Sequence, residues 1–265
     1  MKIKIYQVDA FTSKLFKGNP AAVCLLDRWI GDSVMQQISA ENNLSETAFL
    51  VRSAEYVEIR WFTPVAEVDL CGHATLAAAH VLFTEGIIGT ERIEFRSNRS
   101  GILPVERRGE ELILDFPLDT LEEVTAPRDI LEALKRPPLK TFRGRSDYMF
   151  IYASQSEVEQ LKPDFESLKK LGSRGVIVTS LGNRVHFVSR FFAPGVGINE
   201  DPVTGSAHTT LAAYWAKVLD KKKLKARQLS NRGGEISCEV KGDRVRISGN
   251  AVTYLRGEIE VSVWD

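Results

Sequence analysis

The sequence contains few cysteines, and they are scattered along the chain. Cys24, Cys71 and Cys238 form an odd number and show no CxxC spacing. A disulfide framework needs an even, closely spaced set, and a structural zinc site usually draws on paired cysteines or histidines. We therefore predict neither feature for this chain.

The chain also lacks an excess of charge and a long apolar run. Its 35 Lys and Arg residues balance 35 Asp and Glu residues, which disfavours a nucleic acid as the main partner. No run of about 18 apolar residues could cross a membrane. The first residues, MKIKIYQVDAF, alternate like a strand and lack the apolar core of a signal peptide. These absences predict a soluble, cytoplasmic protein that contacts neither nucleic acid nor membrane.

The remaining composition is that of an ordinary globular protein. The 265 residues are 43% apolar and 26% charged, values that exclude a disordered or collagen-like chain. This length predicts one or two domains with a conventional hydrophobic core.

One stretch of the first half is echoed in the second half. Residues 60–80 read RWFTPVAEVDLCGHATLAAAH, and residues 190–213 read RFFAPGVGINEDPVTGSAHTTLAA. The aromatic stretches lie 130 residues apart, whereas Gly72 and Gly205 lie 133 residues apart, so the loop of the second copy is three residues longer. The echo predicts two similar α+β domains whose equivalent loops face one another. Two unrelated βα units with a common turn are the alternative.

Local patterns predict the other elements. Asp32 or Ser33 is expected to cap the first helix, and the basic run 221–227 is interpreted as the solvated end of a helix. The stretch 117–129, with two prolines, is the best candidate for a linker. Helices are expected near 33–42, 74–85, 129–135, 155–161, 164–171 and 207–219. Strands are expected near 2–9, 20–26, 47–52, 57–63, 92–96, 102–108, 111–116, 148–152, 175–180, 184–191, 234–240, 243–248 and 256–263.

Two glycine turns are candidates for binding an anion. Gly72 and Gly205 each lead from a loop into a helix. The first turn of a helix has free backbone N–H groups, and the aligned peptide dipoles favour negative charge there. Two such turns in paired domains could hold a small carboxylate. An ordinary capped helix, with Ser206 as the N-cap residue, is the alternative.

Two carboxylates accompany these turns. Glu46 lies at the start of an apolar strand, where it is either a solvated strand end or a general base. Asp201 stands five residues before Ser206, where it is either part of an Asp-Pro turn or carried toward the same helix end.

The histidines and Cys71 leave several roles open. His73 and His80 are seven residues apart with no third ligand evident, so we predict no metal site. We interpret His80 as a core residue and His73 as the more exposed of the two. Cys71, at a helix N-terminus, could have a lowered pKa and act as a base. The echo, however, places Thr204 where the second thiol of a two-cysteine racemase would stand, which disfavours such a mechanism.

Four motifs, in this order, resemble the PhzF (phenazine biosynthesis-like) family, a relative of diaminopimelate epimerase and proline racemase. They are GNP at 18–20, LSETAF at 44–49, GHATL at 72–76 and EDPVTGSAH at 200–208. The resemblance implies an α+β fold of two similar, pseudo-symmetric domains, each a mixed sheet wrapped around a central helix, with the active site in the cleft between them. We expect one domain to comprise residues 1–117 plus about 252–265 and the other to comprise residues 118–251.

The resemblance also implies roles for individual residues. Glu46 would be the acid/base that takes a proton from carbon and returns it elsewhere, and His73 and Asp201 would act with it as catalytic residues. The implied substrate-binding residues are Asn19, Gly72, Ala74, Gly205 and Ser206.

The leading hypothesis is therefore an isomerase that shifts a proton on a small carboxylate substrate, without metal or organic cofactor, as a homodimer. The best-known family member acts in this way on dihydro-hydroxyanthranilate. An amino-acid racemase or epimerase that uses Cys71, and a non-catalytic binding protein on the same fold, are the alternatives.

Overall fold

The computed structural model describes residues 1–170 and 174–261. These residues form two compact units. Unit 1 comprises Met1–Asp115 and the C-terminal stretch from Ser248, and unit 2 comprises Phe116–Ile247. The predicted boundaries, after residue 117 and near residue 252, lie two and four residues from these limits. Within the described ranges, no helix is both long and apolar enough to span a bilayer.

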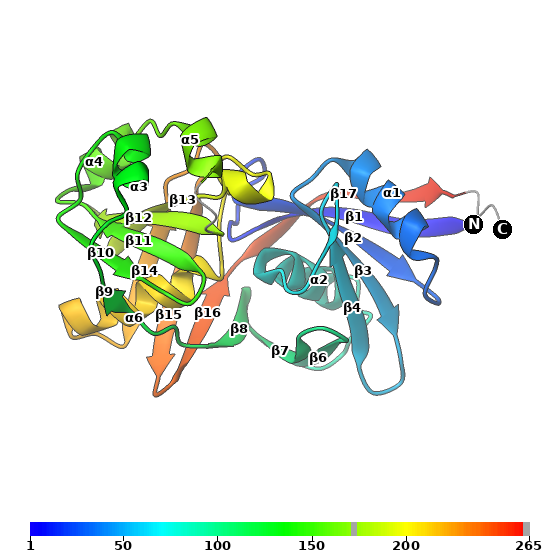
Figure 1. The fold of residues 1–265 in the computed structure, drawn as a ribbon. Helices are drawn as coiled ribbons and strands as arrows, with labels where there is room; N and C mark the ends of the chain where they lie inside the picture. Colours follow the sequence, from blue (N-terminus) through cyan, green and yellow to red (C-terminus); the bar gives the residue numbers. More distant parts are fainter. Residues whose placement is uncertain (171–173, 262–265) are drawn as a thin grey trace. The chain divides into compact units, whose positions relative to one another are not determined.

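Unit 1 is built on a mixed sheet (Figure 1). The strands pair in the order β17–β1–β2–β3–β4–β6–β7–β8; β2 is parallel to β3, β4 is parallel to β6, and the other pairs are antiparallel. A short strand, β5, also pairs with β4. The strands are β1 Lys2–Ala10, β2 Asn19–Leu26, β3 Glu46–Arg52, β4 Val57–Phe62, β5 Glu67–Val68, β6 Arg92–Ser97, β7 Gly101–Arg108, β8 Glu111–Pro117 and β17 Ala251–Glu260.

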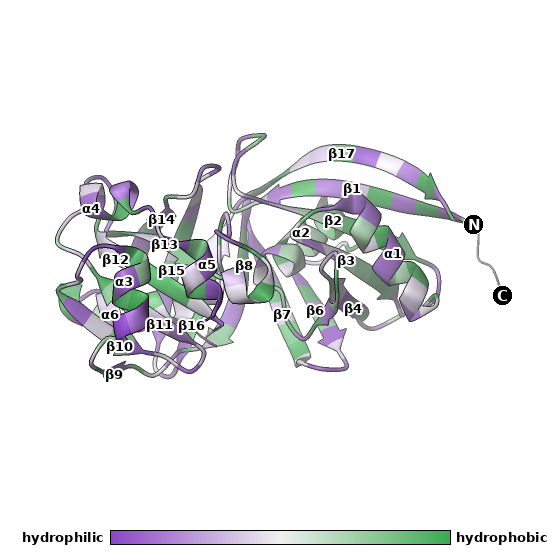
Figure 2. Ribbon diagram, turned by 45° about the horizontal axis from the view of Figure 1, so that its top comes forward, coloured by the Kyte–Doolittle hydropathy of each residue, from purple (hydrophilic) through white to green (hydrophobic). Residues whose placement is uncertain are grey.

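Two helices cover this sheet. Helix α1 (Asp32–Asn42) packs on β3 and β4, and helix α2 (Gly72–Thr84) packs on β1, β2, β3 and β17. Ten of the thirteen residues of α2 are buried, because Ala, Leu, Val and Phe cover nearly its whole circumference. Strand β2 lies between α2 and a second apolar cluster, and all its residues after Asn19 are correspondingly apolar. In β1, by contrast, hydrophilic and hydrophobic residues alternate at the start (Figure 2).

Unit 2 repeats the pairing pattern of unit 1. Its strands pair in the order β9–β10–β11–β12–β13–β14–β15, with β11 parallel to β12 and β13 parallel to β14. The series β1 to β7 without β5 therefore has the same alternation of antiparallel and parallel pairs as the series β10 to β15. The strands are β9 Glu122–Glu123, β10 Lys140–Arg143, β11 Asp147–Ile151, β12 Gly175–Leu181, β13 Phe187–Phe192, β14 Lys223–Gln228, β15 Gly234–Lys241 and β16 Arg244–Gly249.

The helices of unit 2 follow the same plan. Helix α6 (Ala207–Leu219) lies between β13 and β14 in the chain, as α2 lies between β4 and β6, and it packs on β14 and β15. The short helices α3 (Arg128–Leu134), α4 (Gln155–Gln160) and α5 (Phe165–Lys169) contribute to a separate apolar cluster. A single 3₁₀ turn, η1 (Pro194–Val196), lies in the longer loop of the second copy. The echo in the sequence thus corresponds to equivalent βα segments of two similarly built units.

Three local predictions were wrong. The basic run 221–227 follows helix α6 and its residues in β14 are exposed, as predicted, but most of it is strand β14 rather than a helix end. Leu224, Ala226 and Gln228 alternate with the basic residues and are buried. Helix α1 begins at Asp32 with Gly31 at the N-cap position and no side-chain cap. The last strand begins at Ala251 rather than near 256, and residues 262–263 of the predicted strand and 171 of the predicted helix lie outside the described residues.

Candidate active site

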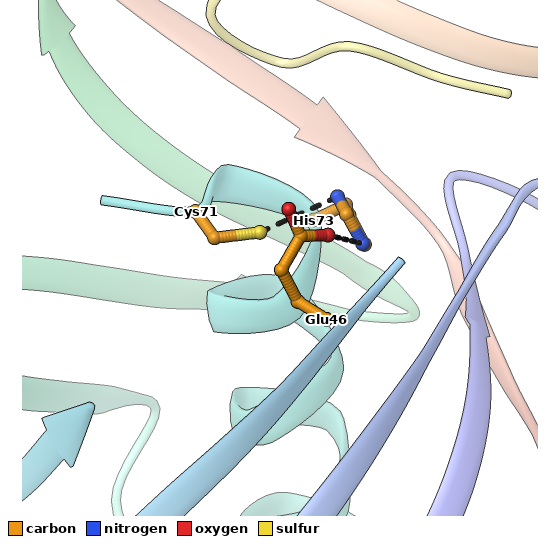
Figure 3. A group of neighbouring side chains, drawn as sticks. All are labelled: Glu46, Cys71 and His73. Atoms are coloured by element: carbon orange, nitrogen blue, oxygen red, sulfur yellow. Dashed lines mark hydrogen bonds and ion pairs between the residues drawn. The ribbon is translucent and has the colours of Figure 1, made fainter. Parts of the chain in front are cut away.

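The predicted residues of unit 1 gather at the N-terminal end of α2. Glu46 is the first residue of β3, which pairs in parallel with β2 next to Asn19. Gly72 and His73 open α2, directly after Cys71. Parallel pairing brings the starts of β2 and β3 to one edge of the sheet, and α2 begins at that edge. Figure 3 shows Glu46, Cys71 and His73 converging there.

The His73 ring lies at the centre of this group. Its Nε2 atom is 3.1 Å from Glu46 Oε2, and its Nδ1 atom is 3.2 Å from Asn19 Nδ2 and 3.5 Å from Cys71 Sγ. Asn19 in turn accepts a hydrogen bond from Ser45 Oγ. Since an amide NH₂ group only donates, Nδ1 accepts from Asn19 and the ring carries its proton on Nε2, facing Glu46.

This group is almost closed to solvent in the structure of unit 1. The side chains of His73 and Glu46 are only 7% and 13% exposed. Their facing atoms, Nε2 and Oε2, lie at ion-pair distance, yet neither has a partner in hydrogen-bond geometry among the residues described. Two buried polar atoms in this state are uncommon, and their 3.1 Å separation is short enough for the two groups to exchange a proton after a small movement.

Burial and charge act in opposite directions on these groups. Burial raises the pKa of the Cys71 thiol to about 11, with the Glu46 charge adding to the effect and His73 opposing it. The prediction of a lowered thiol pKa was therefore wrong, because the dry surroundings outweigh the helix N-terminus. Burial lowers the pKa of His73, whereas the neighbouring Cys71 and Glu46 groups raise it. Because the Cys71 thiol is protonated and Asn19 donates to Nδ1, we describe the ring as neutral, with its proton on Nε2.

The same three side chains are close enough to share a metal ion. One donor atom each from Glu46, Cys71 and His73 lies within 4.8 Å of the others. Oxygen, sulfur and nitrogen donors of this kind suit zinc. Binding an ion would require loss of the thiol proton, which the high pKa of Cys71 opposes. The contacts of the His73 ring with Glu46 and Asn19 also fit a proton-transfer network, which is the interpretation developed below.

The predicted residues of unit 2 gather at the N-terminal end of α6. Asp201 is buried, and its carboxylate accepts a hydrogen bond of 2.5 Å from Thr204 Oγ1. The fully buried Gln228 holds the loop from both sides, since it donates to Asp201 O and accepts from Thr204 N. Thr204, the counterpart of Cys71, thus orients a carboxylate instead of offering a thiol.

Ser206 and the two α2 histidines differ from the sequence interpretation. Ser206 stands at the N-cap position of α6, but its side chain caps no backbone group and accepts a hydrogen bond of 3.2 Å from Arg174. His73 is buried, whereas His80 is half-buried and lies 3.0 Å from Thr253 Oγ1. The expected order of exposure is therefore reversed.

Sequence reasoning missed three side chains of these groups. They are Ser45, Arg174 and Gln228, which contact predicted site residues in the structure. Ser45 lay within a recognised motif, and Gln228 lay in a strand that was not predicted. A cavity of about 310 Å³ lies elsewhere in unit 1, near the C-terminal end of α2, where Leu82 and Lys4 line it.

The sequence of this chain matches a known protein family. The sequence model of the family described as "Phenazine biosynthesis-like protein" (PhzC–PhzF) matches residues 8–257. The chain belongs to the PhzF family. An "uncharacterized isomerase" of Pseudomonas aeruginosa is 51% identical over 262 residues, which cover 99% of this chain and all of the relative.

Solved structures agree with this assignment. A PhzF-family crystal structure from Enterococcus faecalis superposes with a TM-score of 0.95 at 46% identity and covers 98% of this chain and all of that one. A hydroxyproline epimerase from Agrobacterium vitis has a TM-score of 0.64 at 11% identity, with 97% of this chain and 92% of that chain covered, which shows a shared fold alone. The PhzF-family chain is thus an isomerase with an α+β, epimerase-like fold.

Proposed function

We propose that this chain is a cofactor-independent isomerase in which Glu46 moves a proton between two carbon atoms of a small carboxylate substrate. The observation that carries the proposal is the Glu46–His73 contact of 3.1 Å between two buried atoms without hydrogen-bond partners among the described residues. A carboxylate at that point can accept a proton from a substrate carbon. The same group, once protonated, can return the proton to a second carbon.

The proposed reaction is a proton shift without net oxidation. The C–H bond at one carbon breaks, its electron pair moves into the adjoining unsaturated system, and a C–H bond forms at another carbon. The His73 ring restrains the carboxylate, because its Nε2 atom lies 3.1 Å from Glu46 Oε2. Asn19 fixes the tautomer of His73 through Nδ1.

Unit 2 offers no second acid/base at the equivalent position, which supports a one-base mechanism. Thr47 pairs with Phe62 in unit 1, and Val176 pairs with Phe192 in unit 2. Since Phe62 and Phe192 are equivalent in the echo, the residue before Val176 corresponds to Glu46. That residue is Gly175, and a Cβ atom there would meet the Phe191 ring at 2.2 Å.

The test is exchange of hydrogen with solvent. In D₂O, a panel of small carboxylic acids that includes dihydro-hydroxyanthranilate should yield an acid that gains deuterium at carbon in the presence of the protein. Glu46→Gln should lower this exchange roughly 10²–10⁴-fold while binding of the same acid persists, because the amide cannot accept the proton. Glu41→Gln, on the exposed face of α1, is the matched control. Normal turnover by Glu46→Gln would refute the role of Glu46.

Two further outcomes address the alternatives. A racemase that uses Cys71 as a base would lose activity in Cys71→Ala, whereas the present proposal expects most of the exchange to remain, because a thiol with a pKa of about 11 is protonated at neutral pH. A panel in which no acid binds or exchanges would favour a non-catalytic binding protein. The homodimer expected from the family resemblance remains a proposal, to be tested by light scattering.

A further inference from the structure

Unit 2 carries a positive charge directly before the position that corresponds to the acid/base of unit 1. Because Gly175 corresponds to Glu46, the preceding residue, Arg174, corresponds to Ser45. In unit 1, Glu46 at this strand start contacts the His73 ring. Ser45 donates to Asn19, which contacts the other side of the same ring. In unit 2, Arg174 donates a hydrogen bond to Ser206. Ser206 follows Gly205 as His73 follows Gly72, so the two residues hold equivalent positions. The two units thus present different chemistry at equivalent ends of their helices.

Arg174 is held in a fixed orientation by a buried carboxylate. Its Nε atom donates to Asp147 Oδ1 at 3.0 Å, and its Nη2 atom donates to Asp147 Oδ2. The Asp147 side chain is only 3% exposed, so this two-point contact is shielded from water. The guanidinium also lies over the Phe191 ring, 5.5 Å from its centroid. The remaining side of the group is thereby oriented before any ligand arrives.

That remaining side is open to a ligand. Nη1 donates one hydrogen to Ser206 Oγ at 3.2 Å. A guanidinium has five N–H donors, and the contacts with Asp147 and Ser206 use three of them. The Arg174 side chain is 41% exposed, so the other two donors can reach a bound group. The first-turn N–H groups of α6 favour negative charge at the same helix end.

We propose that Arg174 is a specificity-determining residue that binds the carboxylate of the substrate together with Ser206. The inference rests on the proposed function, since it assigns the anionic group on which that function depends. Arg174 selects acids over their neutral amides because a planar fork matches the two oxygens of a carboxylate. Asp147 is a positioning residue that keeps the fork in place.

The experiment compares an acid with its neutral isostere. Anthranilate and 2-aminobenzamide are both fluorescent, and their affinities are measured by titration, together with any acid that exchanged deuterium and its amide. The wild-type protein should bind each acid at least tenfold tighter than the amide. Arg174→Gln should lose roughly 10- to 100-fold in affinity for the acid and little for the amide. Arg174→Lys should recover part of the loss, because it restores the charge but not the fork.

Two variants guard against an effect on folding. Arg174→Gln leaves the buried Asp147 carboxylate unpaired, which can destabilise unit 2. The double variant Arg174→Gln/Asp147→Asn removes that charge as well and should still lose the preference for the acid. Arg184→Gln, an exposed arginine of the same unit, should bind like the wild-type protein.

The outcomes separate this inference from the proposed function. Equal losses for acid and amide, an unchanged preference in both Arg174 variants, or no preference in the wild-type protein would each overturn the inference. If Glu46→Gln abolishes exchange while the Arg174 variants keep the preference, only the inference fails. If Glu46→Gln exchanges normally while Arg174→Gln loses the preference, only the proposed function fails.

Discussion

The buried side chain of His208 forms a hydrogen bond at the N-terminal end of helix α6. Its Nδ1 atom lies 2.8 Å from Thr204 O and therefore donates to it. The equivalent contact in unit 1 is a hydrogen bond of 2.7 Å from Thr75 Oγ1 to Cys71 O. In both units, the residue before the glycine accepts a hydrogen bond at its backbone oxygen from the side chain four residues later. The His208 ring is fully buried, and burial lowers its pKa to about 4.

We predict that His208 makes the protein less stable in mild acid. The unfolded chain binds a proton near pH 6.5 and the folded chain only near pH 4, so stability falls as the pH drops through this window. Between pH 7 and pH 5 the contribution is on the order of 2 kcal/mol. His208→Asn keeps a donor for Thr204 O but does not titrate.

Urea unfolding at pH 7 and pH 5 measures this effect. The free energy of unfolding of His208→Asn should fall by about 2 kcal/mol less than that of the wild-type protein over this interval. The comparison uses the change with pH within each protein, so a constant loss of ring packing cancels. Parallel pH curves for the two proteins would contradict the prediction.

At the scale of elements, each unit fastens its helix-entry loop with the same arginine fork. In unit 1, Arg60 donates to the two oxygens of Glu67 at 2.7 and 2.9 Å. In unit 2, Arg190 donates to the two oxygens of Glu200 at the same two distances. The loop of unit 2 is three residues longer, yet its fork is unchanged. The three additional residues lie between Pro194 and Glu200. The fork therefore holds both ends of the longer loop, and Asp201 directly follows it.

We predict that Gly175→Ala destabilises unit 2. The new Cβ atom would lie 2.2 Å from Phe191 Cζ and 2.6 Å from Cε2, so the ring that supports Arg174 must move. Overpacking of this kind costs about 1–3 kcal/mol, measured as the free energy of unfolding in urea. Affinity for anthranilate should also fall, because Arg174 loses its support. Gly89→Ala is the control, since nothing lies within 4 Å of its added Cβ; equal stability of both variants would contradict the prediction.

At the scale of the whole molecule, the chain closes unit 1 with its last strand. Strand β17 pairs antiparallel with β1 from Lys2 and Glu260 to Ala10 and Ala251, with one irregularity after Gln7. Unit 1 is thus made from both ends of the sequence, while unit 2 is one continuous segment. Contacts between such distant segments form only when both ends are present.

We predict that a chain ending at Asn250 loses unit 1 but keeps unit 2 folded. Removing β17 exposes one edge of β1 and uncovers part of α2, which packs on both strands. Hydrogen exchange followed by mass spectrometry should show fast exchange in β1, β2 and α2 and retained protection in β11 to β13. A chain ending at Val261 keeps the whole of β17 and is the control. Uniform loss of protection in both units would contradict the prediction.

Much of the candidate site could be predicted because its residues lie in short, ordered motifs. Glu46, His73 and Ser206 all stand within a few residues of the start of a strand or helix, where local pattern is informative. The contacts Asn19–His73 and Arg174–Ser206 span 54 and 32 residues, and no local pattern specifies them. Strand β14 was missed because charged residues occupy its exposed face, although Leu224 and Ala226 alternate on its buried face.

The sequence by itself determined the repeat, most of the helices and strands, and the motif residues Glu46, His73, Asp201 and Ser206, because hydrophobic period and glycine turns act over a few residues. Only the tertiary structure decided the state of those residues. Burial made the Cys71 thiol a weak acid, the parallel pairing of β2 and β3 brought Asn19 and Glu46 to the same helix end, and Asp147 turned Arg174 toward Ser206. Solvation and charge depend on everything packed around a group, and the packing joins segments that are far apart along the chain.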